Sequence, residues 1–125
     1  MSDKDIESEI QAKGLTAPRV TLNHIESIIA SEHYFTGSDG VLGAYKNNDD
    51  VYVGSAPSDK SVRPLDLITF CVLVLQNGFT VTGESACASP ENFDPEIGRK
   101  IARENAVNKI WMLEGYLLKQ RLSEK

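Results

Sequence analysis

The chain has 125 residues, a formal charge of −5, two cysteines and an apolar fraction of 41%. This length suits one domain, and two cysteines argue against a secreted scaffold held together by disulfides. The longest apolar run, Phe70 to Leu75, has six residues, whereas a membrane-spanning helix needs ~20, so we expect a soluble cytoplasmic protein.

The charge is unevenly distributed along the chain. Residues 1–95 carry 14 acidic and 6 basic residues, a net −8, whereas residues 96–125 carry 4 acidic and 7 basic residues, a net +3. Such a basic segment either contacts phosphates or an acidic partner, or complements the acidic remainder within the fold or across an oligomer. The isoelectric point near 5.0 disfavours a general duplex-DNA binder.

The N-terminal residues 1–18 are predicted to be a flexible polar lead-in to a single domain over residues 19–125. They are rich in Asp, Glu, Ser and Lys, and they end in a helix-breaking Gly-Leu-Thr-Ala-Pro stretch. Ile6 and Ile10 lie four residues apart. This spacing leaves open a short amphipathic turn that docks on a partner.

A helix is predicted from about Leu22 to His33. Thr21 is a suitable N-cap, and the apolar residues that follow have the spacing of a one-sided helix: Leu22, Ile25, Ile28 and Ile29. Gly37, Asp39 and Gly40 are expected to end this helix.

Residues 37–64 are the least informative part of the sequence. Val41-Leu42 and Val51–Val53 flank the polar stretch Lys46–Asp50, which is consistent with a short hairpin. Residues 54–61 have the composition of an exposed loop. A long loop in a compact domain is either functional or simply variable, and the sequence does not decide between the two.

A β-hairpin is predicted over residues 68–82. The β-branched and aromatic run Ile68–Leu75 meets Phe79–Thr82 through Asn77-Gly78, a residue pair that favours a two-residue type I′ turn. A helix is the alternative for the first run alone, but the alternation of Phe, Thr and Val after the turn favours strands.

This turn also predicts the register of the hairpin and its two faces. Leu75 is expected to pair with Thr80, and Cys71 with Glu84. One face is then wholly apolar and belongs to the core: Phe70, Val72, Val74, Phe79 and Val81. The opposite face carries Cys71, Leu73 and Leu75, and it needs cover from residues 37–64 or from another subunit.

A long helix is predicted from Asp94-Pro95-Glu96, which has the residue order of a helix start, to about Gln120. Its apolar residues occupy more than half of the circumference, which is more than one small sheet covers. We therefore expect a homo-oligomer, with an interface at Gly98, Ala102, Ala106, Ile110, Leu113 and Leu117. The elements together predict an α+β fold: an N-terminal helix, a β-hairpin alone or within a small antiparallel sheet, and a long C-terminal helix.

The sequence carries no recognisable apparatus for catalysis or metal binding. His24 and His33 are nine residues apart, and Cys71 and Cys87 are sixteen apart, so no paired zinc-ligand spacing exists. Nucleophile elbows, phosphate loops and dinucleotide fingerprints are absent. We therefore expect no enzymatic activity, no cofactor and no metal.

The segment between the hairpin and the long helix is the candidate ligand site. It gathers polar groups near a helix N-terminus, which attracts anions, and two arginines one turn apart add donors for phosphate or carboxylate. The residues expected to bind the ligand are Glu84, Ser85, Asn92, Arg99 and Arg103. Alternatively, the dipeptides Ser89-Pro90 and Asp94-Pro95 only cap and stiffen the connection, and Phe93 fills the core.

The runs Phe70–Asp94, Glu96–Arg103 and Asn105–Leu118 closely resemble a family of small tailed-phage proteins. This family includes a product of Shigella phage Sf6 and also occurs in prophages. The similarity covers residues 65–122 and, more weakly, Pro18 to Val41. The resemblance implies an accessory protein made in the host cytoplasm during infection, and it implies no catalytic residues.

We therefore expect a non-enzymatic phage accessory protein that binds a host protein or a small anionic metabolite such as a signalling nucleotide. One alternative is a structural or assembly role in the virion, which predicts that the protein is present in purified particles. A second is nucleic-acid binding through the basic helix, although only Trp111 and Tyr116 offer aromatic stacking there.

Overall fold

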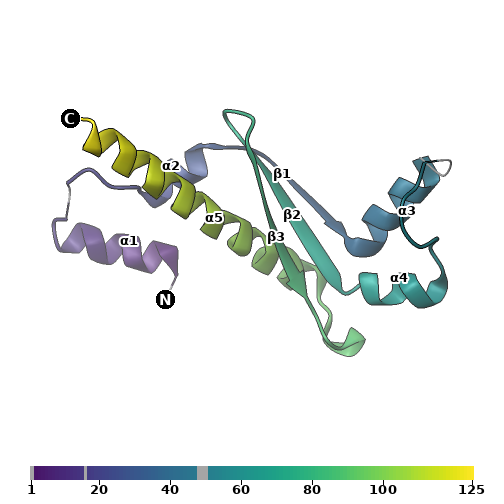
Figure 1. Ribbon diagram of the computed structural model, residues 1–125. Coiled ribbons are helices and arrows are strands. Elements are labelled where there is room, and N and C mark those ends of the chain that lie inside the picture. The colour runs from purple at the N-terminus through teal and green to yellow at the C-terminus, as the bar shows by residue number, and fades with distance from the viewer. Residues whose placement is uncertain (1, 16, 48–50) are drawn as a thin grey trace.

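The computed structural model of the protein describes residues 2–15, 17–47 and 51–125, and it has the predicted α+β fold (Figure 1). The elements in chain order are α1 (Asp3–Ala12), α2 (Leu22–Ser27), β1 (Ile29–Thr36), α3 (Gly37–Asn47), α4 (Asp59–Leu65), β2 (Ile68–Leu75), β3 (Thr80–Ala86), the 3-10 turn Pro90–Asn92 and α5 (Pro95–Ser123). The strands form one antiparallel sheet in the order β1-β2-β3. Among the described residues, no helix is both long enough and apolar enough to cross a membrane.

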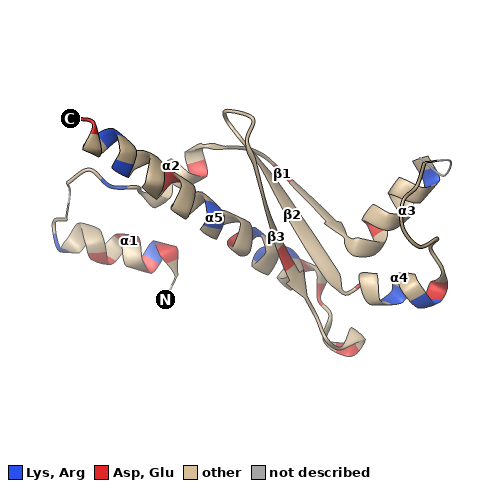
Figure 2. Ribbon diagram, viewed as in Figure 1, with Lys and Arg blue, Asp and Glu red and all other residues tan. Residues whose placement is uncertain are grey.

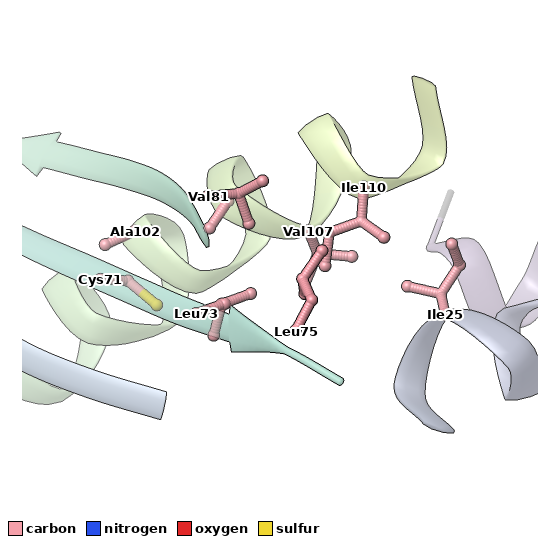
Figure 3. Packing of buried hydrophobic residues seen from close by; sticks show 9 residues of the cluster. Ile25, Cys71, Leu73, Leu75, Val81, Ala102, Val107 and Ile110 are labelled. Carbon is pink, nitrogen blue, oxygen red and sulfur yellow. The ribbon is translucent and has the colours of Figure 1, made fainter. Parts of the chain in front are cut away.

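The core lies between the sheet and α5, which crosses one face of it (Figure 1). The buried apolar side chains are Cys71, Leu73 and Leu75 of β2, Val81 of β3, Ala102, Ala106, Val107 and Ile110 of α5, and Ile25 of α2. Figure 3 shows Leu75 lying beside Val107, while Ile25 approaches from α2. The fold is therefore two layers, one of sheet and one of helix.

Small residues let α5 and the sheet approach each other closely. A Cβ atom added to Gly83 of β3 would lie 2.2 Å from the backbone oxygen of Ala102 and 2.4 Å from the backbone nitrogen of Ala106. Gly98 is buried near Thr69, and Ile110 is fully buried. In the structure these α5 residues face the chain's own sheet, whereas the sequence predicts a partner helix there.

The hairpin between β2 and β3 is confirmed, but the predicted type I′ turn is wrong. Gly78 has a φ of +88°, whereas no described residue other than glycine has a positive φ, so Asn77 does not adopt the conformation that a type I′ turn requires. The Leu75 N–H donates to the Phe79 carbonyl oxygen at 2.8 Å. These two residues close a three-residue loop in which glycine takes the left-handed position.

The longer loop shifts the register by one residue, and with it the predicted faces. Leu73 pairs with Val81 and Cys71 with Gly83, rather than with Thr82 and Glu84. A shift of one residue exchanges the two faces of a strand. The shift places Val81 on the face that carries Cys71, Leu73 and Leu75. This face is the buried one, and its cover is α5 rather than residues 37–64 or another subunit.

The other side of the sheet has no helix along it in Figure 1. We call this side the open face. It is formed by Ser31, His33 and Phe35 of β1, Phe70, Val72 and Val74 of β2, and Thr80, Thr82 and Glu84 of β3. Phe35 stacks on Phe70 with 5.7 Å between ring centroids, and the apolar residues of β2 on this face are half-buried.

The predicted helix from Leu22 to His33 is only partly present. Thr21 caps it as expected, since its hydroxyl accepts from the His24 backbone N–H at 3.1 Å. The helix ends at Ser27, and β1 follows and pairs with β2. Helical spacing at Ile28 and Ile29 is overridden because an unpaired β2 edge recruits this β-branched and aromatic segment.

The hairpin predicted within residues 37–64 is also wrong. Gly37 begins α3 rather than ending a helix, because Thr36 and Asp39 form reciprocal side-chain to backbone hydrogen bonds of 3.0 and 3.1 Å, the arrangement of a capping box. Within residues 54–61, Ser58 and Ser61 form a second such box, which begins α4. The predicted turn Lys46–Asp50 falls partly on residues 48–50, which lie outside the described residues.

The two ends of the chain are helical. Asp94 caps α5 as predicted, because one carboxylate oxygen accepts from the backbone N–H groups of Glu96 and Ile97 at 2.9 and 3.2 Å. The 29 residues of α5 extend about 43 Å. Within the predicted lead-in, α1 is a helix rather than a short turn; the division of the chain at residue 18 stays a prediction.

Candidate functional site

The junction between β3 and α5 brings the end of the sheet against the first turns of the long helix. The Cys87 backbone N–H donates to the Leu67 carbonyl oxygen at 2.9 Å, which ties the outgoing segment to the start of β2. The 3-10 turn follows, and Phe93 then leads into the Asp94 cap. The junction is thus held at both ends, and the half-buried Phe93 lies inside it.

Two hollows flank Phe93. The Asn92 hollow has a volume of about 150 Å³ and is lined by Leu67, Ser85, Ala86, Cys87, Asn92, Phe93, Asp94, Ile97, Gly98 and Ile101. The Arg99 hollow has a volume of about 170 Å³ and is lined by Tyr34, Phe35, Thr36, Asp39, Thr69, Phe93, Pro95 and Arg99. Each is smaller than the 300–1,000 Å³ typical of a ligand pocket, so each accommodates one group of a larger molecule.

The structure brings together three of the five residues predicted to bind a ligand. Ser85 and Asn92 line one hollow, and Arg99 lines the other. Glu84 does not join them, because neighbouring residues of a strand point to opposite faces. Its side chain lies on the open face, opposite Phe70.

Arg103 also lies outside the candidate site. Its guanidinium donates to Glu32 at 3.0 Å and to Glu26 at 2.9 Å, and the side chain is only 28% exposed. These hydrogen bonds, first from Glu26 and then from Glu32, raise the pKa of Arg103 above its ordinary value. Arg103 therefore joins α5 to α2 and β1 rather than offering donors to a ligand.

The charges around the Arg99 hollow favour an anion only at Arg99 itself. Arg99 is exposed and has no ion pair within the part of the chain that the structure describes. Asp39 lines the same hollow, but its carboxylate accepts from the Thr36 backbone N–H at 3.0 Å. The Asp94 cap already engages two N–H groups of the first α5 turn, which leaves Arg99 as the principal donor.

The histidines and cysteines have local partners. His24 Nε2 lies 2.5 Å from Glu114 Oε1, and His33 Nε2 lies 3.0 Å from the Ser31 hydroxyl. Cys71 is buried in the core, and Cys87 has an Sγ–O distance of 3.2 Å to Ser89. In the described ranges, no three such ligands gather where they could hold a metal ion. That the chain is not an enzyme stays a prediction.

The sequence misses the β1 contribution to the site. Tyr34, Phe35 and Thr36 supply one wall of the Arg99 hollow, but the helix predicted from the sequence ends at about His33 and leaves these three residues without an element. The run of two aromatic residues and a threonine is the available signal, because such residues favour strands. Phe93, predicted as an alternative to fill the core, is half-buried and lines both hollows.

Basic residues are spread along α5 rather than gathered into one block. Figure 2 shows blue segments at several levels of this helix, with acidic segments on the neighbouring elements. Arg103 forms ion pairs with two acidic residues of the chain itself. For this residue, the basic segment therefore complements the acidic part of the chain within the fold.

Comparison with known proteins places the chain in a family. No curated protein and no solved structure matches it. A family model described as "Phage protein (N4 Gp49/phage Sf6 gene 66) family" matches residues 20–122. The match includes the whole sheet, the junction and nearly all of α5, and it begins after α1. The chain therefore belongs to this phage protein family.

Proposed function

We propose that the protein is a phage accessory protein of the host cytoplasm, without enzymatic activity, that binds a small anionic metabolite such as a signalling nucleotide at the junction. The observation that carries this proposal is the Arg99 hollow, where a guanidinium without an acidic partner among the described residues lies beside Tyr34 and Phe93. Guanidinium groups recognise phosphate and carboxylate. Aromatic rings offer stacking surfaces to a planar base.

The two hollows support a ligand with two distinct ends. Arg99 would hold the anionic end, and the Asn92 hollow on the other side of Phe93 would take a polar group. Ser85 and the Asn92 amide supply both hydrogen-bond donors and acceptors there. A nucleotide combines a phosphate with a polar, planar base, and it fits this division better than an inorganic ion does.

Thermal stabilisation by a panel of linear and cyclic adenine and guanine nucleotides tests the proposal. A binding nucleotide at 100-fold excess over its Kd should stabilise the protein by about 2.7 kcal/mol. Arg99→Ala should abolish that stabilisation. Lys100→Ala is the matched control, because Lys100 is the next residue of α5 and, among the residues that the structure describes, pairs only with the exposed Glu96 at 3.3 Å.

The same experiment can contradict the proposal in two ways. No nucleotide of the panel stabilises the protein, or a nucleotide stabilises wild type and Arg99→Ala equally. In the second case the ligand binds elsewhere on the chain. Stabilisation that Lys100→Ala abolishes as well would indicate general attraction to a basic helix rather than a site.

The open face favours a second candidate, binding of a host protein. Phe35 is 37% exposed there, and Phe79 at the adjacent hairpin loop is 56% exposed. An apolar sheet face of this kind is a common protein-binding surface. A tagged wild type should then co-purify one host protein from infected cells, and Val72→Lys should lose it while remaining folded. Recovery of the chain in purified particles would instead favour the virion role.

A further inference from the structure

Among the described residues, two contacts between side chains fasten α1 to the rest of the chain, together with a longer hydrogen bond of 3.5 Å from the Leu22 backbone N–H to Glu7. The Arg19 guanidinium donates to both carboxylate oxygens of Glu7, at 3.0 and 2.5 Å. The Trp111 indole N–H of α5 donates to an Asp3 carboxylate oxygen at 3.1 Å. The Glu7 and Arg19 side chains are 22% and 21% exposed, so this pair is the better shielded of the two contacts.

Between these contacts, the side chains of α1 do not fill the space that separates this helix from α5. A hollow of about 460 Å³ lies between α1 and α5, and its lining is Asp3, Ile6, Glu7, Ile10, Arg19, Val20, Asn108 and Trp111. No residue of α1 is buried, and Ile6 remains 43% exposed. We call this space the α1 hollow. The apolar side of α1 therefore contributes little packing energy.

A helix held in this way opens easily. Ten residues are too few for an isolated helix to be stable in water, and most helical stability in proteins comes from packing an apolar face. Segments with few buried apolar contacts open at a small fraction of the global unfolding free energy. The family model also begins at residue 20, so α1 lies outside the part of the chain that this family defines.

We propose that α1 is a detachable cover over the Trp111 side of α5, held closed by the Glu7–Arg19 pair and the Asp3–Trp111 hydrogen bond. Detachment makes the apolar lining of the α1 hollow, chiefly Val20 and Trp111, accessible without unfolding the sheet and α5. The cover lies by the C-terminal half of α5, whereas the junction lies at its N-terminal end (Figure 1). The inference therefore does not rest on the proposed ligand site.

Hydrogen exchange and the fluorescence of Trp111, the only tryptophan of the chain, test this proposal on the full-length protein. In wild type, the amides of α1 should exchange at least about tenfold faster than the core amides of α5 around Ala106 and Ile110. Arg19→Ala should speed α1 exchange by about a further fivefold and shift Trp111 emission to the red. The core amides of α5 should keep their wild-type rates.

Two matched variants sharpen the test. Lys13→Ala removes the Lys13–Glu9 pair, which lies 3.2 Å apart at the C-terminal end of α1 and faces solvent, and it should leave Trp111 emission unchanged. Exchanging the two charges, with Glu7→Arg and Arg19→Glu together, should restore the wild-type emission and α1 exchange rate.

Three results would overturn the proposal. The first is α1 exchange as slow as that of the α5 core in wild type, which would make α1 a fixed part of the fold. The second is an Arg19→Ala variant with the emission and α1 exchange of wild type. The third is an Arg19→Ala variant in which α1 and the α5 core lose protection together, because the pair would then stabilise the whole domain.

Discussion

Gly83 marks the place where β3 and α5 meet backbone to backbone. A methyl group there would lie within 2.4 Å of two backbone atoms of α5, and backbone atoms cannot rotate away as side chains do. We predict that Gly83→Ala lowers the free energy of unfolding by at least about 2 kcal/mol, measured by denaturant titration.

A second glycine provides the control for that substitution. Gly43 lies within α3, and an added Cβ would meet nothing within 4 Å. Gly43→Ala should therefore stabilise the protein, by up to about 1 kcal/mol, because alanine has the higher helix propensity. Equal effects of the two substitutions would contradict the close approach of β3 and α5.

Glu32 makes folding stability depend on pH. Hydrogen bonds from Arg103 and then from Tyr34 hold the pKa of the Glu32 carboxyl below its ordinary value of 4.5. Since this pKa is lower in the folded state, the stability that Glu32 adds is fully present above about pH 4.5 and is lost as the pH falls through the lowered pKa. We predict that Glu32→Gln is less stable than wild type near neutral pH, with the difference shrinking toward about pH 3.

Chemical denaturation at several pH values checks this prediction. Glu104→Gln serves as the control, because Glu104 is exposed and forms no hydrogen bond or ion pair with the described residues. A gap between wild type and Glu32→Gln that stays constant from neutral to acidic pH would refute it.

At the scale of elements, the sequence predicts the features that neighbouring residues determine, but it does not predict which distant segments pair as strands. The start of α5 follows from Asp94 and Pro95, which act within one helical turn. In contrast, β1 forms because β2 lies beside it, across more than thirty residues of sequence. Helical spacing at Ile28 and Ile29 carries no information about that neighbour.

The hairpin shows how one dihedral angle decides many contacts. Asn77-Gly78 predicts a turn in the correct place, but only Gly78 has a positive φ. The resulting three-residue loop moves Glu84 opposite Phe70 and removes it from the candidate site. The sequence therefore predicts the position of Ser85 correctly, because the register leaves this residue beside α5. It does not predict the position of Glu84.

Two substitutions in this loop test the turn itself. Gly78→Ala should cost about 1 kcal/mol of unfolding free energy, because alanine disfavours the φ of +88° found there. Asn77→Ala should cost only about 0.5 kcal/mol, for the lost hydrogen bond from the Phe79 N–H to the Asn77 side chain. Similar costs of about 1 kcal/mol or more at both positions, measured by thermal unfolding, would indicate the type I′ turn instead.

For the molecule as a whole, contacts within the fold partly neutralise the uneven charge of the sequence. Arg103 from the basic segment pairs with Glu26 and Glu32 from the acidic one, and His24 lies against Glu114. These contacts tie α2 and β1 to α5. The basic segment is therefore a structural complement as well as a surface, which sequence alone leaves undecided.

The apolar stripe of α5 continues beyond the sheet that covers its first half. Ala102, Ala106 and Ile110 are buried, whereas Leu113 and Leu117, which follow at the same helical spacing, are each 40% exposed. We infer that a second copy of the chain covers this continuation, because a helix that projects past its own sheet leaves an apolar surface that association removes from water.

Sedimentation or native mass measurement at micromolar concentration tests that inference. Wild type should be oligomeric, and Leu117→Lys should weaken association by more than about tenfold, since it places a charge in an apolar contact. Ser123→Lys adds the same charge at the exposed end of α5 and should leave association unchanged. A monomeric wild type would contradict the inference that a second copy covers the stripe. If both substitutions weakened association equally, the added charge alone would explain the effect, and the apolar stripe would not be the interface.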